Sequence, residues 1–447
     1  MNSVEAFIEA IFENRVPESV QQWDAHRDEL KLDFVAAAMA GDLESVQAML
    51  EIDRGLARQT LPPYDRPILC YVCQSRLIEV PRFEQGILDV VRALLKAGAD
   101  PDSSYSSEWG NEEWKETALY GAAGVVNHAG LTKLLLDAGA DPDDGAIQDG
   151  IYHGESLYHA CDFPGRNECL RLLLEANPSQ VAAEYSLNRK LDFEDEEGVR
   201  LFLDHGANPN GNKTRSALSH AILRGRSTTI LALLLAAGAD PNHLELDGTT
   251  PYVMARRLAD RAASELLESH GARAEFGPYD AVLIAAADED QAEVERLVST
   301  YPEILQGLSD LGRQEHDGFA LGAAGQLLHD MARLGHVKAL KALLDLGMDP
   351  GARNQYNETP LHWACVAGRA EAAELLLERG APQDVIERNH NCVPVQWVYW
   401  GSEYWNEPHG DYGKTAEVLL NAGSPLPERL EGSEAVKAVL RARGLVD

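Results

Sequence analysis

The residues whose type and spacing most clearly suggest a chemical role are two cysteines separated by two residues, Cys70 and Cys73. This spacing is used both for redox pairs and for one half of a tetrahedral zinc site. A zinc site needs two further ligands at a similar spacing, and the sequence contains neither a second such pair nor a matching pair of histidines. Six cysteines in 447 residues do not form a disulfide framework either. We therefore predict no metal and no cofactor.

Acid–base chemistry is the second possibility, because His159, His220 and Asp330 stand in a chain rich in carboxylates. The sequence, however, has no nucleophile elbow, no glycine loop for a phosphate and no HExxH pair of zinc ligands. His316 and His409 lie close to aspartates, but two loop histidines do not make a ligand set. We therefore predict that the chain is not an enzyme. The alternative is an enzyme that acts through acid–base groups in a groove on a polar small molecule or a sugar.

The charge balance restricts the partners of the chain. Lysine and arginine number 39 against 72 aspartates and glutamates, which gives a formal net charge of −33. Such a field repels phosphate backbones and anionic lipids, so we expect neither nucleic acid nor a membrane as partner. A charged protein partner should be basic. The sequence shows no secretion leader and no apolar stretch of about 18 residues, and we expect a cytoplasmic protein.

A repeated phrase indicates the elements that carry these residues. The phrase at residues 97–102, AGADPD, returns in similar form at 138–143, 205–210 and 237–242, after an apolar triplet or its remnant. Glycines 206, 238 and 271 are spaced by 32 and 33 residues, and glycines 347 and 380 by 33. The glycine suits a helix C-cap, and the proline prevents the helix from continuing. Upstream, Thr359-Pro360-Leu361-His362 carries the N-cap and first-turn proline that begin a helix.

Together these motifs resemble the ankyrin-repeat family, whose unit is a hairpin-like turn followed by two antiparallel helices. The resemblance implies an all-α solenoid of about eleven stacked helix-turn-helix units over residues 33–426. Capping helices are expected at 1–32 and at 427–447. The resemblance fades near 186–210, where Lys190 falls on a position that is usually small and buried, and near 279–305. Insertions interrupt the period near residues 76–85, 103–116, 306–325 and 400–412.

The resemblance also implies roles for single residues. One position of the first helix faces the concave groove in the family, and here it holds mainly rings and polar groups, among them Tyr71, His159, His220, Asp330, Trp363 and Trp397. The cysteines at 73, 161 and 365 share a small buried position of that helix, so we expect them to be structural. The alternative for Trp363 and Trp397 is that they only pack against each other.

Tryptophans also gather near two of the insertions. Trp109 and Trp114 lie among glutamates, and Trp400 and Trp405 lie near the C-terminal end. An aromatic ring flanked by carboxylates suits a lysine or arginine side chain. We therefore predict a protein–protein interaction scaffold, or adaptor, that grips a basic partner along the groove and these loops. An inhibitor or immunity protein that blocks a basic active site is a narrower version, which the sequence leaves open.

Overall fold

The chain forms two compact units in the computed structural model. Unit 1 comprises residues 1–212 with 236–238, and unit 2 comprises residues 213–235 with 239–447. The structure describes all residues except 1, 110–111, 145, 149–150, 154–155, 213–214, 247, 305–322, 355, 406, 408 and 447. Side chains are not described at 108–109, 112–114, 146–148, 151–153 and 323–326.

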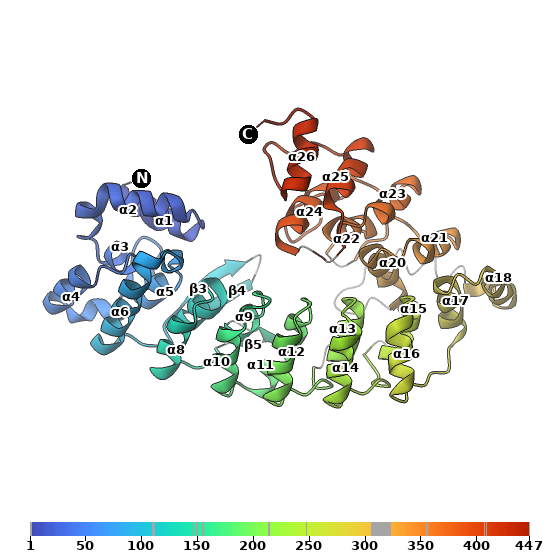
Figure 1. Cartoon of the computed structure of the whole chain (residues 1–447), viewed down its shortest axis with the longest axis horizontal. Helices are drawn as coiled ribbons and strands as arrows, with labels where there is room; N and C mark the ends of the chain where they lie inside the picture. The colour runs from blue at the N-terminus through green and yellow to red at the C-terminus, as the bar shows by residue number, and fades with distance from the viewer. Residues whose placement is uncertain are drawn as a thin grey trace. The chain divides into compact units, whose positions relative to one another are not determined.

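Unit 1 is a succession of short paired helices (Figure 1). Its α-helices are α1 (Ser3–Phe12), α2 (Val16–Leu30), α3 (Phe34–Met39), α4 (Leu43–Ile52), α5 (Ile68–Cys73), α6 (Pro81–Ala97), α7 (Ala118–Tyr120), α8 (Ala129–Asp137), α9 (Ser156–Ala160), α10 (Glu168–Glu175), α11 (Gln180–Lys190) and α12 (Glu196–Asp204). Two 3-10 helices and one π-helix join them: η1 (Arg54–Arg58), η2 (Arg76–Glu79) and η3 (Gly121–Val125).

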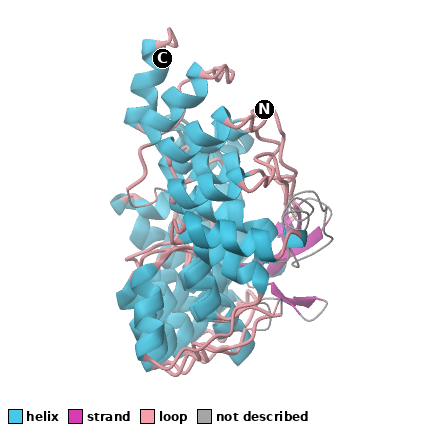
Figure 2. Ribbon diagram, turned by 90° about the vertical axis from the view of Figure 1, so that its right-hand side faces the viewer, coloured by secondary structure: helices cyan, strands magenta, loops and turns pink. Residues whose placement is uncertain are grey.

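Among the described residues, three antiparallel hairpins accompany the helices of unit 1. Strands are drawn in magenta in Figure 2. The hairpins are β1 (Thr60–Leu61) with β2 (Arg66–Pro67), β3 (Ser104–Trp109) with β4 (Glu112–Thr117), and β5 (Ala146–Gln148) with β6 (Ile151–His153). The β3–β4 hairpin is anchored to α5, because Gln74 Nε2 donates a hydrogen bond of 3.0 Å to the Tyr105 hydroxyl.

Unit 2 repeats the same plan of paired helices. Its elements are α13 (Ala217–Leu223), α14 (Thr228–Ala236), α15 (Pro251–Arg257), α16 (Arg261–Ser269), α17 (Pro278–Ala287), α18 (Gln291–Thr300), α20 (Ala323–Leu334), α21 (Val337–Asp345), α22 (Pro360–Val366), α23 (Ala370–Glu378), α24 (Pro394–Trp400), the π-helix η4 (Gly401–Trp405), α25 (Tyr412–Asn421) and α26 (Glu434–Ala442).

The helices stack in two rows within each unit. First helices contact the first helices of the next pair, as α20 does α22 and α22 does α24, and second helices do the same, as α21, α23 and α25 show. The leucines of the apolar triplets fill the space between the rows, and Leu135, Leu234 and Leu376 are fully buried. This burial removes apolar surface from water and holds neighbouring pairs together. The all-α fold class predicted from the sequence is confirmed.

The helix ends are made by the residues that the repeated phrases contain. At the start of α22 the Thr359 N–H donates to His362 Nδ1 at 3.1 Å, and Pro360 occupies the first helical position. At the end of α6, Gly98 adopts a left-handed conformation with φ of +100°. Burial lowers the pKa of His362 to about 4, so this histidine is neutral and serves as a hydrogen-bonding residue of the turn.

The expected insertions take different structures. Residues 76–85 become η2 and an added first turn of α6, and residues 103–116 become most of the β3–β4 hairpin. Residues 400–412 contain η4. The insertion expected near 306–325 lies almost wholly outside the described residues. The helices α1 and α2 lie where the sequence predicts an N-terminal cap, and α26 lies where it predicts a closing helix.

Candidate functional site

The two tryptophans of the expected groove row lie next to each other in unit 2. Trp363 belongs to α22 and Trp397 to α24, and their ring centroids are 6.0 Å apart at 64°. Both side chains are half-buried. Trp363 Nε1 donates a hydrogen bond of 3.1 Å to Glu358 Oε2, which orients the ring. Burial raises the pKa of the Glu358 carboxyl, although Asn354 and Trp363 both donate hydrogen bonds to it.

A second group of rings follows where α24 passes into η4. The ring of Trp400 is 5.8 Å from that of Tyr404 and 6.1 Å from that of Trp405. Trp400 is 49% exposed and Tyr404 is 67% exposed, whereas Trp405 is half-buried. Sequence reasoning selected both tryptophans but missed Tyr404. Its position between them on a helical turn is the signal that could have found it.

Two other residues of the expected row, His220 and Asp330, lie among arginines of unit 2. Arg224 Nε donates a hydrogen bond of 3.4 Å to His220 Nε2, and its guanidinium carbon lies 5.6 Å from the centroid of Trp405. Asp330 is buried, and this burial raises its pKa to about 6 although Arg333 and other arginines lower it. Burial also lowers the pKa of Arg333 to about 10. The surroundings of this part of the row are therefore cationic.

The residues of the row that belong to unit 1 have different environments. Tyr71 is fully buried: its hydroxyl donates to Leu61 O at 3.0 Å and accepts from the Tyr64 N–H at 2.8 Å. A partner cannot contact Tyr71 in this structure, because the β1–β2 turn and Phe12 of α1 cover the ring. This environment departs from the groove position expected for Tyr71.

His159 of unit 1 is half-buried in a cluster of rings and charges. Its Nδ1 atom lies 3.1 Å from Asp162 Oδ2, and its ring lies 5.1 Å from those of Tyr120 and Tyr158. Asp162 also accepts a hydrogen bond of 2.6 Å from Arg189 Nε. Trp109 and Trp114 belong to β3 and β4, and their side chains lie outside the described residues.

The cysteines show no sign of redox or metal chemistry in the part of the chain that the structure describes. All six thiols are free, and those at positions 70, 73, 161, 169 and 365 are buried. Burial raises the pKa of Cys70 to about 12, which suppresses the reactive thiolate. Among the described residues, no group of three His, Cys, Asp or Glu side chains could hold a metal ion.

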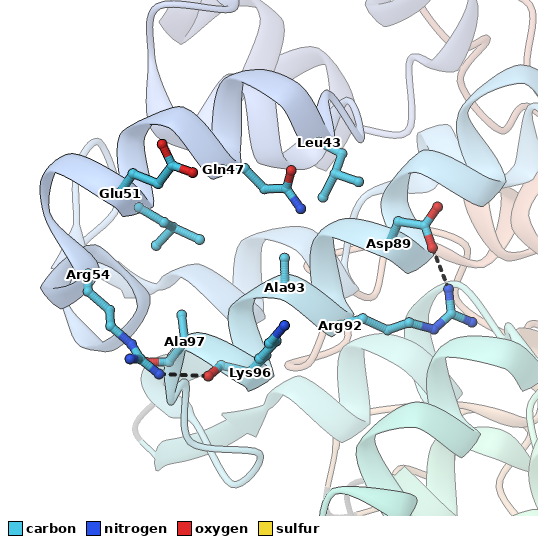
Figure 3. A pocket seen from close by; sticks show the side chains of 10 residues that line it. Leu43, Gln47, Glu51, Arg54, Asp89, Arg92, Ala93, Lys96 and Ala97 are labelled. Atoms are coloured by element: carbon cyan, nitrogen blue, oxygen red, sulfur yellow. Dashed lines mark hydrogen bonds and ion pairs between the residues drawn. The ribbon is translucent and has the colours of Figure 1, made fainter.

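A groove of about 570 Å³ lies between α4 and α6 of unit 1 (Figure 3), and its ten lining residues include none of the predicted site residues. Its lining mixes acidic and basic side chains, and two of the cations, Arg54 and Arg92, have structural partners. Arg54 donates hydrogen bonds of 2.9 Å to Lys96 O and 3.1 Å to Ala97 O, which satisfies the C-terminal end of α6. Arg92 pairs with Asp89 at 2.6 Å. These contacts explain the groove as packing between successive second helices.

Comparison with known proteins agrees with this architecture. A family model described as ankyrin repeats, with three copies, matches residues 283–389. The chain is 27% identical over 208 residues to a transient receptor potential cation channel subfamily A member 1 homolog from Caenorhabditis elegans, and 26% identical over 347 residues to the E3 ubiquitin-protein ligase KEG from Arabidopsis thaliana. It is 31% identical over 179 residues to ankyrin repeat and SOCS box protein 16 from Homo sapiens.

These similarities cover 46, 72 and 38% of this chain but only 16, 19 and 37% of the respective relatives. The chain thus spans much less than two thirds of the length of these relatives. Ankyrin repeats generally mediate protein–protein interactions, and the all-α repeat solenoid contains such repeats at 283–389. In the described residues, no helix is both long and apolar enough to span a membrane.

Proposed function

We propose that the chain is a non-catalytic protein-binding module built from about eleven ankyrin-like units over residues 33–426. Its partner presents lysine or arginine side chains to the rings of unit 2. The match to ankyrin repeats at 283–389 and the regular stacking of helix pairs support the class of function. Trp363, Trp397, Trp400 and Trp405 supply the contact surface, and Tyr404 joins them.

The observation that carries this proposal is the exposure of Trp400 and Tyr404. The rings of Trp400 and Tyr404 are 49% and 67% exposed, so they leave apolar surface in contact with water. Binding to a partner would remove this surface from water, which is favourable. Tryptophan and tyrosine are also the residues that contribute most to protein interfaces. The two rings lie in the same unit as the half-buried pair Trp363 and Trp397.

The basic character of the partner follows from charge and ring chemistry. A guanidinium or ammonium group above a tryptophan ring is attracted by the electrons of that ring. Glu403 lies in η4 between these rings, and its side chain is 37% exposed. Its carboxylate can therefore pair with the lysine or arginine group of the partner that contacts the rings. The net charge of −33 steers basic partners toward the chain from a distance.

The test uses defined peptides. Fluorescence anisotropy compares an oligo-arginine peptide with an oligo-glutamate peptide of equal length, against wild type, Trp400→Ala and Tyr404→Ala. We expect binding of the arginine peptide only, with a loss of about 1–2 kcal/mol in each variant. Tyr279→Ala removes a ring that is 40% exposed in α17 and should bind normally. Since none of these substitutions changes the net charge, equal affinity in all three variants would reject the aromatic site.

A further inference from the structure

The segment that carries the exposed rings also has an inner side, which is formed by its contacts with buried residues of unit 2. We call η4 together with Glu407 the latch. Trp405 Nε1 donates a hydrogen bond of 3.0 Å to Glu407 Oε1, and the Trp405 ring lies against the guanidinium of Arg224. Glu407 is buried and Trp405 is half-buried, whereas Tyr404 is 67% exposed to solvent.

Glu407 is the centre of this inner side. Its side chain is only 7% exposed, and its Oε1 atom lies 3.5 Å from both Arg226 Nη2 and Arg333 Nη1. The backbone N–H of Glu407 donates to the Tyr412 hydroxyl at 2.9 Å, and that hydroxyl donates to Val366 O at 3.1 Å. The backbone of Glu407 is thus held by Tyr412 of α25, while its carboxylate pairs with the two arginines.

The two arginines come from distant parts of unit 2. Arg226 follows α13 and is 181 positions from Glu407 in the chain, and Arg333 belongs to the last turn of α20. Both guanidinium groups are almost fully buried, at 4% and 2% exposure. Arg333 Nη2 has no hydrogen-bond partner in the described structure. Removing the carboxylate partner of a buried cation strongly destabilises the folded state. The contacts of Glu407 therefore connect the latch with the segment after α13 and with α20.

The outer side of the latch is placed by the same backbone. A side chain at Gly401 would meet Val366 O at 2.4 Å, so η4 lies directly on α22 at this residue. Ser402 accepts a hydrogen bond of 2.8 Å from the Ser433 N–H. Trp400 and Tyr404 therefore keep their positions only while η4 stays seated on its neighbours.

We propose that the latch couples partner binding at Trp400 and Tyr404 to the buried contacts of Glu407 with Arg226 and Arg333. Glu407 is a positioning residue that does not itself touch the partner. Coupling of this kind is reciprocal. A partner that binds only when the latch is packed in place stabilises α13 and α20, and loss of the Glu407 contacts lowers the affinity for the partner. The part of this inference that concerns the partner rests on the proposed function, whereas the coupling between the segments does not.

Hydrogen exchange on the full chain tests the coupling without any partner. Glu407→Gln keeps an oxygen for Trp405 Nε1 but removes the charge that faces the arginines. We expect exchange about threefold or more faster both in peptides that contain η4 and in those that contain residues 224–226 and 331–334. Glu403→Gln is the matched control, since it makes the same charge change in η4 at a group paired with Lys437 at 3.6 Å. It should affect at most η4.

The reciprocal variant, Arg226→Gln, should accelerate hydrogen exchange in η4. If Glu407→Gln does not fold, this variant tests the coupling by itself. Acceleration confined to the mutated segment in both variants would overturn the coupling. The oligo-arginine peptide then separates the two proposals. Weaker binding to Glu407→Gln than to Glu417→Gln, by about tenfold, is expected, because Glu417→Gln makes the same charge change in α25 at a group paired with Lys414 at 3.0 Å. If the peptide does not bind wild type, the proposed function is wrong, whereas the hydrogen-exchange result still tests the coupling between the latch and the arginine segments.

Discussion

The ammonium group of Lys190 lies 2.7 Å from the carboxylate of Asp195, and the two side chains are 0% and 5% exposed. Lys190 occupies the position that the repeat usually gives to a small residue. The room comes from Gly198, where a Cβ atom would lie 2.0 Å from Lys190 Cε. Asp195 also accepts hydrogen bonds from the Gly198 N–H at 3.0 Å and the Gly165 N–H at 2.9 Å. A lysine, an aspartate and a glycine thus replace the small side chain together.

Gly198→Ala should be strongly destabilising, because the new methyl group needs the space of the Lys190 side chain. We expect the free energy of unfolding to fall by about 1–3 kcal/mol, as in other overpacked cores. Urea denaturation followed by circular dichroism measures it. Gly413→Ala in α25 is the control: its Cβ would lie 3.4 Å from Ala435 O, and alanine favours the helix by about 1 kcal/mol. Two equal losses would contradict the steric explanation.

Asp195→Asn should destabilise the chain in a pH-dependent manner. Burial by itself raises the pKa of Asp195, but Lys190 and the N–H groups of Gly165 and Gly198 lower it by more, so the folded pKa lies below the usual value. The unfolded state therefore binds more protons in acid, and the stabilisation exists above about pH 4 and disappears as the pH falls through the folded pKa. Denaturation curves between pH 3 and 7 should show wild type and variant converging at low pH. A constant difference would refute the linkage.

Asp330→Asn should show the opposite pH dependence. The folded pKa of Asp330 is about 6, above its unfolded value, so the folded state binds more protons between about pH 4 and 6. Its contribution to stability is present below pH 4 and is lost as the pH rises through 6. The variant lacks this titration, so wild type should lose stability relative to it over this range. The comparison uses thermal melts at several pH values; a relative gain by wild type would show that the arginines outweigh burial.

Thiol labelling distinguishes the structural reading of the cysteines from a redox pair. The cysteines at 73, 161 and 365 are fully buried, and burial raises the pKa of Cys161 to about 12. We expect a chromogenic disulfide reagent to modify Cys392 first, because it is half-buried in the loop before α24, although burial raises its pKa as well. The remaining thiols should react only after denaturant is added. Rapid reaction at Cys70 or Cys73 in the folded protein would restore the redox alternative.

Local sequence patterns were sufficient to locate the helices. The phrase that begins at Thr359 starts α22 at Pro360, and the phrase around Gly98 ends α6. Both effects act within a few residues, through capping hydrogen bonds, the fixed φ of proline and the left-handed conformation of glycine. The same reasoning placed Trp363 and Trp397 on neighbouring helices, where the rings are in contact. That a partner covers these two rings stays a prediction.

The exposure of each row residue, in contrast, was decided by the segments that pack around it, some of which are far away in the chain. Tyr71 and Trp363 share one position in the repeat, yet Tyr71 is covered by Phe12 and the β1–β2 turn while Trp363 stays half-buried. Glu407 lies next to arginines that no local pattern connects with it. The sequence alone therefore determined the repeat, its helices and its buried leucines, since their causes are local and periodic. Burial and charge pairing at single positions depend on which distant side chains share the space, and only the tertiary structure supplies them.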